Sequence, residues 1–242
     1  MADLYSNRFD GYTAAYSQTS WANARDNTGT YVNTSVTRVT TMAQAKRAAG
    51  RGGSILYDVN RSFYYFDTSG ITGTVSSATF KIFGYHSNDG SVIAVKGTAF
   101  GGDGGSALVK EDFNNITGYS AGASLAGNAT DYSATILTTA WSTSGYNDLA
   151  STADLRADMQ NNDVVIICVL DYTNDYLNSA LTSNANLNCG GYYTDYTGTS
   201  RDPYITYEVA TGYGNIVNGV AVASIGKIDG VATADIEKVI GV

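Results

Sequence analysis

The sequence predicts an all-β sandwich with one short helix and a small C-terminal β-extension. Its 242 residues include 27 glycines, 19 tyrosines and one proline, and charged residues make up only 15%, against about a quarter in ordinary globular domains. Short runs of β-branched and aromatic residues alternate with Gly, Ser, Asn and Asp turn signals at the spacing of sandwich strands. A chain of this length can bury a sizeable core as one large all-β domain.

Residues 1–53 are polar and rich in Asn, Thr, Ser and Gly, which predicts loops and edge strands that belong to the sandwich. Within this part, residues 31–39 have the composition of a strand. Residues 42–48 predict one or two helical turns, which the glycines at 50, 52 and 53 would end.

Residues 54–209 carry the densest strand signals and are the predicted sandwich domain. Residues 61–67 are aromatic on both faces, and residues 75–83 alternate apolar and polar side chains as a half-buried strand does. The other strands predicted in this domain are 91–100, 132–139, and the closing strands at 192–193 and 204–209.

One helix and one fully buried strand stand out among these elements. Residues 153–160 predict a helix, because Thr152 can accept from its first free N–H groups and Asp154 lies where the helix dipole favours an acid. Residues 164–170 are apolar at every position, and a strand of that composition is covered on both faces. We therefore expect residues 164–170 to be the central strand.

The C-terminal part, residues 210–242, contains an eleven-residue repeat, in which 217–227 align with 228–238. A helix is disfavoured because each glycine of the repeat costs about 1 kcal/mol relative to alanine. Asn218-Gly219 and Asp229-Gly230 are pairs that form tight hairpin turns, so short antiparallel strands are predicted.

So small a sheet is unstable by itself. This predicts that the extension docks on the main domain, on a sister chain or on another partner. The residues expected to make this assembly contact are Val217, Gly219, Val220, Ile225, Ile228, Gly230, Val231 and Ile236.

The order of elements between residues 54 and 209 resembles a known family. Arg61-Ser62-Phe63, the string from Val75 to Ile82, Trp141 ahead of a short helix, and Asp202-Pro203-Tyr204 are similar to the DNRLRE-type jelly-roll domains. The resemblance implies a jelly-roll β-sandwich like that of carbohydrate-binding modules. The acidic and basic string after which the family is named is absent from this sequence. No role that depends on that string is therefore expected here.

The repeat resembles the endings of tailed-bacteriophage structural proteins. Asn218-Gly219-Val220-Ala221 and Lys238-Val239-Ile240-Gly241-Val242 match phrases that recur in those endings. The resemblance implies a place in a virion.

Composition and charge disfavour several other classes of function. The net charge of −8, without any stripe of Lys and Arg, argues against nucleic-acid binding. No run of 18 apolar residues is present, so no membrane span is expected. The N-terminal residues lack a secretory signal, and Cys168 and Cys189 predict buried free thiols, so we expect folding in a host cytoplasm.

The sequence singles out no catalytic group, and we predict neither catalytic residues nor a resident cofactor. Its 22 acidic residues include enough carboxylates for glycoside hydrolysis, but no pair is distinguished. His86, the one histidine, lies beside a turn-like Asn-Asp-Gly string and is expected to be solvated. The glycine-rich residues 101–105 lack the Lys-Ser/Thr pair of a phosphate site and predict a mobile loop.

Two binding sites are alternatives to this interpretation. Residues 171–176 place several oxygen ligands in one loop, which leaves a structural calcium ion open. Tyr172, Tyr176, Tyr193 and Tyr196 could together form an aromatic platform for a sugar. Tyrosines at strand rims and interfaces are the simpler interpretation.

Together these observations predict a non-enzymatic structural protein of a tailed-bacteriophage virion: a head decoration, head fibre or tail-fibre component. Its expected partners are other virion proteins and further copies of itself. A glycan-binding adhesin that attaches to a host surface is the alternative, and a polysaccharide-cleaving enzyme is a weaker one.

Overall fold

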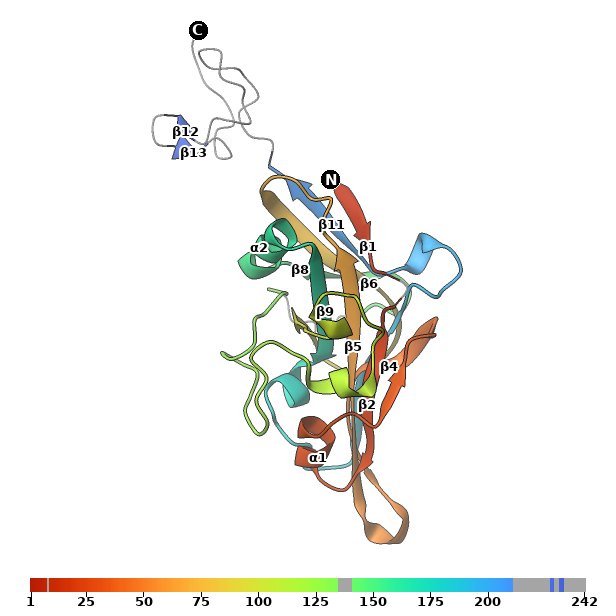
Figure 1. Cartoon of the computed structure of the whole chain (residues 1–242). Coiled ribbons are helices and arrows are strands. Elements are labelled where there is room, and N and C mark those ends of the chain that lie inside the picture. The colour runs from red at the N-terminus through yellow and green to blue at the C-terminus, as the bar shows by residue number, and fades with distance from the viewer. Residues whose placement is uncertain (8, 135–140, 211–226, 229–230, 233–242) are drawn as a thin grey trace.

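Figure 1 shows a computed structural model that describes residues 1–7, 9–134, 141–210, 227–228 and 231–232. Antiparallel strands dominate it, which confirms the predicted all-β sandwich with little helix. The strands and helices are β1 (Ala2–Tyr5), β2 (Gly11–Gln18), α1 (Trp21–Asp26), β3 (Tyr31–Asn33), β4 (Arg38–Ala49), η1 (Arg51–Gly53), β5 (Ile55–Asp67), β6 (Val75–Asn88), β7 (Val92–Lys96), η2 (Phe100–Gly102), η3 (Lys110–Asn114), β8 (Tyr146–Ala150), α2 (Ala153–Asn161), β9 (Val164–Asp171), η4 (Tyr172–Tyr176), β10 (Ala185–Tyr192), η5 (Thr199–Arg201), β11 (Tyr204–Val209), β12 (Lys227–Ile228) and β13 (Val231–Ala232).

One layer, here called the small sheet, has the strand order β1-β11-β6-β8. Its register aligns Leu4, Ile205, Phe80 and Leu149 in one row across the four strands. Ile205, Phe80 and Leu149 belong to one buried hydrophobic cluster, and the partly buried Leu4 packs against it. The inner face of the small sheet is therefore continuous from edge to edge.

The second layer, the large sheet, has the order β10-β4-β5-β2-β3, and β5 also pairs with β9, which pairs with β7. Strand β6 connects the two layers. It pairs with β8 up to Phe83 and with β10 from Gly84 onward. A Cβ atom at Gly84 would lie 1.7 Å from the carbonyl oxygen of Ser142, so only glycine fits where β6 changes partner.

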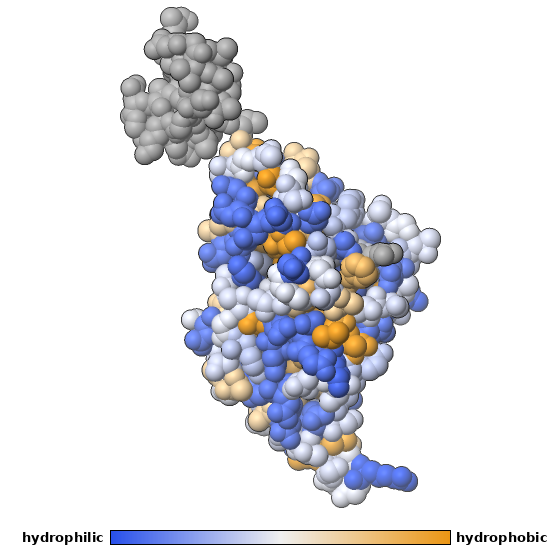
Figure 2. All heavy atoms as spheres, in the orientation of Figure 1, coloured by the Kyte–Doolittle hydropathy of each residue, from blue (hydrophilic) through white to orange (hydrophobic). Residues whose placement is uncertain are grey.

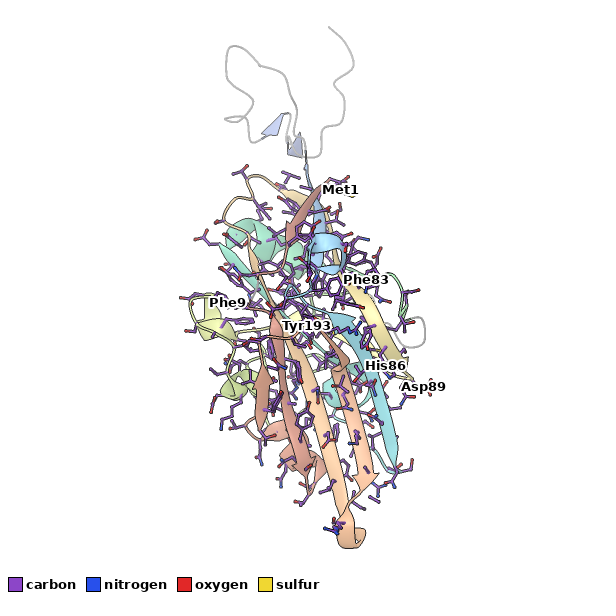
Figure 3. All side chains as sticks on the ribbon, turned by 90° about the vertical axis from the view of Figure 1, so that its right-hand side faces the viewer. Met1, Phe9, Phe83, His86, Asp89 and Tyr193 are labelled. Carbon is purple, nitrogen blue, oxygen red and sulfur yellow. The ribbon has the colours of Figure 1, made fainter. Side chains whose placement is uncertain are left out.

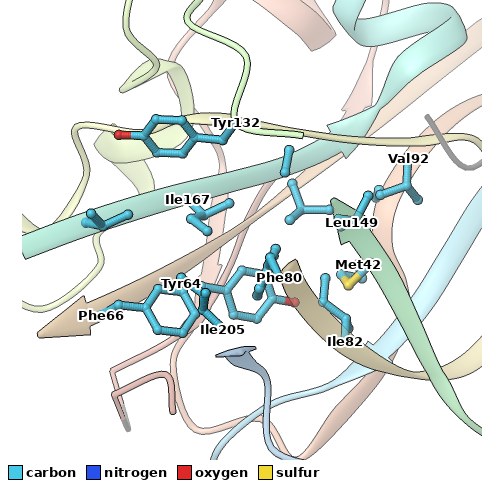
Figure 4. Close-up of a cluster of buried hydrophobic side chains, with 14 of the residues drawn as sticks. Met42, Tyr64, Phe66, Phe80, Ile82, Val92, Tyr132, Leu149, Ile167 and Ile205 are labelled. Carbon is cyan, nitrogen blue, oxygen red and sulfur yellow. The ribbon is translucent and has the colours of Figure 1, made fainter. Parts of the chain in front are cut away.

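The main core fills the space between the two sheets (Figure 4). Phe80 and Ile82 of β6 meet Tyr64 and Phe66 of β5 there, and Phe80 makes edge contacts with both of those rings.

Strand β9 is covered on both faces, as the sequence predicts. Val165, Ile167 and Val169 belong to the core between the sheets, whereas Ile166 and Cys168 belong to a second cluster on the opposite face. Ala99, Phe100, Leu108, Ile116 and Leu125 of the long β7–β8 connection cover that second cluster. The large sheet is thus the middle of three layers.

Helix α2 is also confirmed, with Thr152 as its N-cap accepting from the Leu155 N–H. Helix α1 has no counterpart in the sequence analysis. Ser20 caps it by accepting from the Asn23 N–H, and Trp21 and Ala24 pack on the large sheet.

The helical turns predicted at residues 42–48 are wrong, because this segment is the middle of β4. Its alanines and lysine favour a helix locally, but β4 pairs along one edge with β5 and along the other with β10. Two ladders of backbone hydrogen bonds override a weak helix propensity. Strand β4 is therefore an interior strand, unlike the edge strands expected for residues 1–53.

Two predicted strands have other limits in the structure. The strand predicted at 91–100 is confined to Val92–Lys96. At 132–139, Ser133 forms an isolated bridge with Ser151, and residues 135–139 lie outside the described residues.

In the C-terminal extension, β12 and β13 pair antiparallel, with Lys227 opposite Ala232 and Ile228 opposite Val231. Two residues separate the strands, which is the spacing of the hairpin predicted at Asp229-Gly230. The repeat residues Val217, Gly219, Val220, Ile225, Gly230 and Ile236 lie outside the described residues.

The described helices are all too short or too polar to cross a bilayer. The surface shown in Figure 2 is mainly hydrophilic, with small, scattered apolar areas.

Replacing either Ile166 or Ile167 with Asp should abolish soluble folding. The two side chains are 4% and 0% exposed, and an unpaired carboxylate there costs several kcal/mol. Soluble yield and thermal melting measure the effect, with the exposed Thr72→Asp as control. Melting within a few degrees of the parent for both core variants would show that β9 is not central.

Candidate functional site

The interior holds a buried ion cluster of Arg25, Arg61 and Asp175, whose side chains have no solvent exposure. Arg61 of β5 donates from Nε to Asp175 Oδ2 at 2.7 Å and from Nη2 to Oδ1 at 2.6 Å. Arg25 of α1 donates from Nε to the main-chain carbonyl of Asp175 at 2.8 Å, and the same nitrogen lies 3.3 Å from Asp175 Oδ1. One aspartate therefore joins β5, α1 and η4.

Residues of η3, in the β7–β8 connection, cover the ion cluster. The Phe113 ring lies 4.2 Å from the Arg61 guanidinium carbon, and Arg61 Nη1 donates to the Phe113 carbonyl and to Asn114 Oδ1. Burial alone would lower the pKa of Arg61, but the charge and hydrogen bonds of Asp175 raise it above its ordinary value. Because solvent does not reach these groups, the ion cluster is a structural element.

The segment predicted as a calcium loop does not fit a calcium ion. Asp171 Oδ1 accepts from the Asn174 N–H at 2.7 Å, and Oδ2 accepts from Ser91 Oγ at 2.9 Å. Asp175 is bound by the two guanidiniums. These carboxylates meet protein donors where calcium would need free oxygens. Within the described ranges, no group of three or more His, Cys, Asp or Glu side chains is placed to hold a metal.

A second buried acid, Asp10, lies where the chain crosses from the small sheet to the large one. Its carboxylate accepts from the Thr194 N–H and from Thr194 Oγ1 at 2.7 Å. Burial raises its pKa from 3.8 to about 8, against the lowering effect of the bonds to Thr194 and Ser6, and the charge of Asp195 adds to the rise. Asp10 is therefore largely protonated in the folded protein at neutral pH.

The four tyrosines predicted as a sugar platform lie in three separate places. Tyr172 stacks on Tyr176 at 5.4 Å, and the Tyr176 hydroxyl donates to Asp131. Tyr193 is fully buried and stacks on Tyr64 in the core. Tyr196 alone lies on the outer face of the sandwich, in an edge contact with Tyr192 at 4.9 Å.

Tyr196 belongs to a larger set of rings, here called the aromatic row, on the side of the molecule turned to the viewer in Figure 3, where Phe83 is labelled. Neighbouring rings lie 4.9 to 5.7 Å apart, from β1 across β11, β8 and β6 to Tyr192 of β10, which contacts both Tyr85 and Tyr196. Its members are Tyr5, Tyr204, Tyr146, Phe83, Tyr192, Tyr85 and Tyr196.

Two arginines lie over the aromatic row. The Arg38 guanidinium carbon is 4.5 Å from the Tyr85 ring centre, and that of Arg201 is 4.8 Å from Tyr192 and 5.0 Å from Tyr196. Both donate from Nη1 to the Tyr192 hydroxyl. Over the part of the chain that the structure describes, neither guanidinium forms an ion pair with a carboxylate.

Most of the aromatic row could not be predicted from the sequence, because its rings come from five strands and the loop after β10, and the register of those strands is not visible in the sequence. One signal was present. In the strand predicted at 75–83, the outward positions are Ser77, Thr79 and Lys81, and then Phe83. A large apolar ring at the end of a polar face indicates that something covers that face.

A polar hollow of about 450 Å³ lies beside α2, lined by Lys96, Tyr132 and Asn162 among others. Asp158 at its side accepts from Lys96 Nζ at 2.8 Å, from the Tyr132 hydroxyl and from Asn162 Nδ2. Burial would raise the pKa of Asp158, but these bonds lower it below its ordinary value. Asp158 is therefore ionised, and its hydrogen-bonding capacity is used by protein donors.

Comparison with known proteins assigns this chain to no family. No family model matches it, and no curated protein matches its sequence.

The replacement Asp175→Asn should lower the free energy of unfolding by about 3–5 kcal/mol, because it leaves the buried guanidinium of Arg61 without a carboxylate, while Arg25 keeps its ion pair with Asp26. The control is Asp148→Asn, which removes the ion pair with Lys81 from a side chain that is 57% exposed and should cost at most about 1 kcal/mol. Urea unfolding measures both variants. Equal, small losses would contradict the role given to the ion cluster.

Asp10 should make stability depend on pH. Its pKa is higher in the folded chain, about 8 against 3.8, so the folded state binds the proton more tightly. The stabilisation by that proton is complete below about pH 4 and is lost as pH rises through about 8. The free energy of unfolding of the parent should therefore fall more steeply between pH 4 and 9 than that of Asp10→Asn. If the free energies of unfolding of the parent and of Asp10→Asn change with pH in parallel, Asp10 is not a buried, protonated acid in the folded chain.

Proposed function

We propose that this chain is a non-enzymatic structural protein of a tailed-bacteriophage virion, which joins the particle through its C-terminal β-extension. The phage assignment rests on the resemblance of the repeat to the endings of phage structural proteins. A head decoration, a head fibre and a tail-fibre component all remain compatible with it.

The observation that carries the proposal is the separation of the extension from the sandwich. Of the described strands, β12 and β13 pair only with each other, and they lie beyond the end of the sandwich where β11 finishes (Figure 1). Two strands of two residues cannot be stable alone. An extension of this kind gains its stability from a binding partner.

The sandwich supports the proposal because its described hydrophobic clusters are built from residues before position 210. Its central strand β9 is covered on both faces by residues before position 210. The ion cluster also uses only residues of the sandwich. Such a domain can be displayed on a particle while a separate segment makes the attachment.

A chain ending at Val209 should fold with the parent's melting temperature and yet fail to join particles. The expected result follows because the truncation removes the docking segment and leaves the core intact. Particles assembled with and without residues 210–242 can be purified and compared by gel and mass spectrometry. Normal incorporation of the truncated chain would show that the extension does not assemble the protein.

Glycan binding at the aromatic row is a second candidate function. Ring faces stack on the apolar faces of sugars, and the row adds two guanidiniums without carboxylate partners in the described chain. The positive charge of these two guanidiniums favours a sugar that carries a carboxylate. Tyr196 is the one residue of the predicted platform that takes part.

For this second function, Tyr196→Ala should weaken binding to acidic oligosaccharides at least tenfold, because the ring and the Arg201 contact are lost together. Tyr172→Ala, which changes a ring away from the row, is the matched control. Titration calorimetry with oligogalacturonate and with a neutral dextrin measures both. If the two variants weaken binding equally, or if neither affects it, the aromatic row is not a sugar-binding site.

A further inference from the structure

Strand β1 is one edge of the small sheet, and among the described strands it pairs only with β11. The Ser6 N–H donates to the Pro203 carbonyl, and in an antiparallel ladder every second residue faces the partner strand. Leu4 and Ala2 therefore face β11, and the N–H and C=O groups of Asp3 and Tyr5 face outward. This edge can accept another strand.

A hollow of about 540 Å³ lies at the start of this edge. Its lining comes from both ends of the sandwich chain: Met1 and Ala2, Ser76, and Tyr207 to Ala210. Met1, Val209 and Ala210 contribute apolar residues to this lining, and Glu208 contributes an acidic one. The free edge of β1 and the hollow thus form one surface, here called the β1 edge site.

The chain itself supplies a segment that suits the β1 edge site. Residues 211–242 follow directly after Ala210, which lines the hollow. The first repeat, residues 217–227, has Lys227 as its single charged residue, and the site presents the acids Asp3 and Glu208. The sequence predicts short apolar strands in the repeats, of the kind that add to a sheet edge.

In the single chain, however, β12 and β13 lie away from β1, beyond the end of the sandwich (Figures 1 and 3). The site on β1 is therefore left for the extension of a different molecule. Every copy has one extension and one free edge, so the same contact can be repeated from copy to copy.

We propose that the β1 edge site binds the C-terminal extension of a second copy of this chain, by strand addition to Asp3 and Tyr5. The inference rests on the proposed assembly role of the extension and names its docking site.

Disulfide trapping between two differently tagged chains tests the contact. One chain carries Asp3→Cys, and the other carries Val231→Cys or Ala232→Cys, neighbouring positions that face opposite sides of a strand. Native Cys168 and Cys189 are both buried and contribute little background. We expect a mixed disulfide between the two chains with at least one of the extension positions.

The control replaces Asp3→Cys with Arg51→Cys, an exposed position on the β4–β5 hairpin, and should give no mixed product. Equal trapping with Arg51→Cys would overturn the proposal. In a chain that carries both Asp3→Cys and Val231→Cys, a disulfide that forms within one molecule would overturn it as well.

A second variant, Asp3→Pro, distinguishes failure of the proposed docking site from failure of the proposed assembly role. Asp3→Pro removes an outward N–H that β11 does not use, and an edge strand tolerates such a proline. We expect parent-like melting and at least tenfold weaker self-association by sedimentation. If the chain ending at Val209 is monomeric but Asp3→Pro still associates, the site is wrong and the assembly role stands. If the chain ending at Val209 still associates, the assembly role itself fails.

Discussion

The carboxylate of Asp175 holds two guanidiniums in the interior, and the arrangement of the layers depends on this interaction. Arg61 comes from the middle of the large sheet, Arg25 from the one-and-a-half turns of α1, and Asp175 from the turn after β9. A buried charge without its partner costs several kcal/mol. The three segments, together with the covering Phe113, are therefore fixed relative to one another.

This constraint also limits where function can lie. In the described part of the chain, the ion cluster and the long β7–β8 connection cover one face of the large sheet's centre, and the small sheet covers the other. Among the described residues, the outer face with the aromatic row and the end of the sandwich where β1 and β11 meet the extension remain accessible, as does the polar hollow beside α2. The proposals for glycan binding and for assembly follow from the first two of these features.

The sequence predicted features that depend on neighbouring residues and missed those that depend on distant ones. The apolar run of β9 and the cap at Thr152 are local, and both are confirmed. Strand β4 was missed because its pairing with β5 and β10 overrides its local helix preference. The ion cluster joins Arg61 to Asp175, 114 positions apart, and no pattern along the chain shows that pairing. Tyr193 was expected on a surface, but it stacks on Tyr64 in the core.

Hydrogen–deuterium exchange of the full chain, below and above the concentration at which it associates, tests the central claim most directly. Because the described hydrophobic clusters of the sandwich are built from residues before position 210, peptides of β5 and β9 should be strongly protected at both concentrations. Peptides covering residues 2–5 and 227–232 should gain protection together on association. Protection of 227–232 to the same degree in the dissociated chain would show that the extension folds on its own molecule, and would contradict the account.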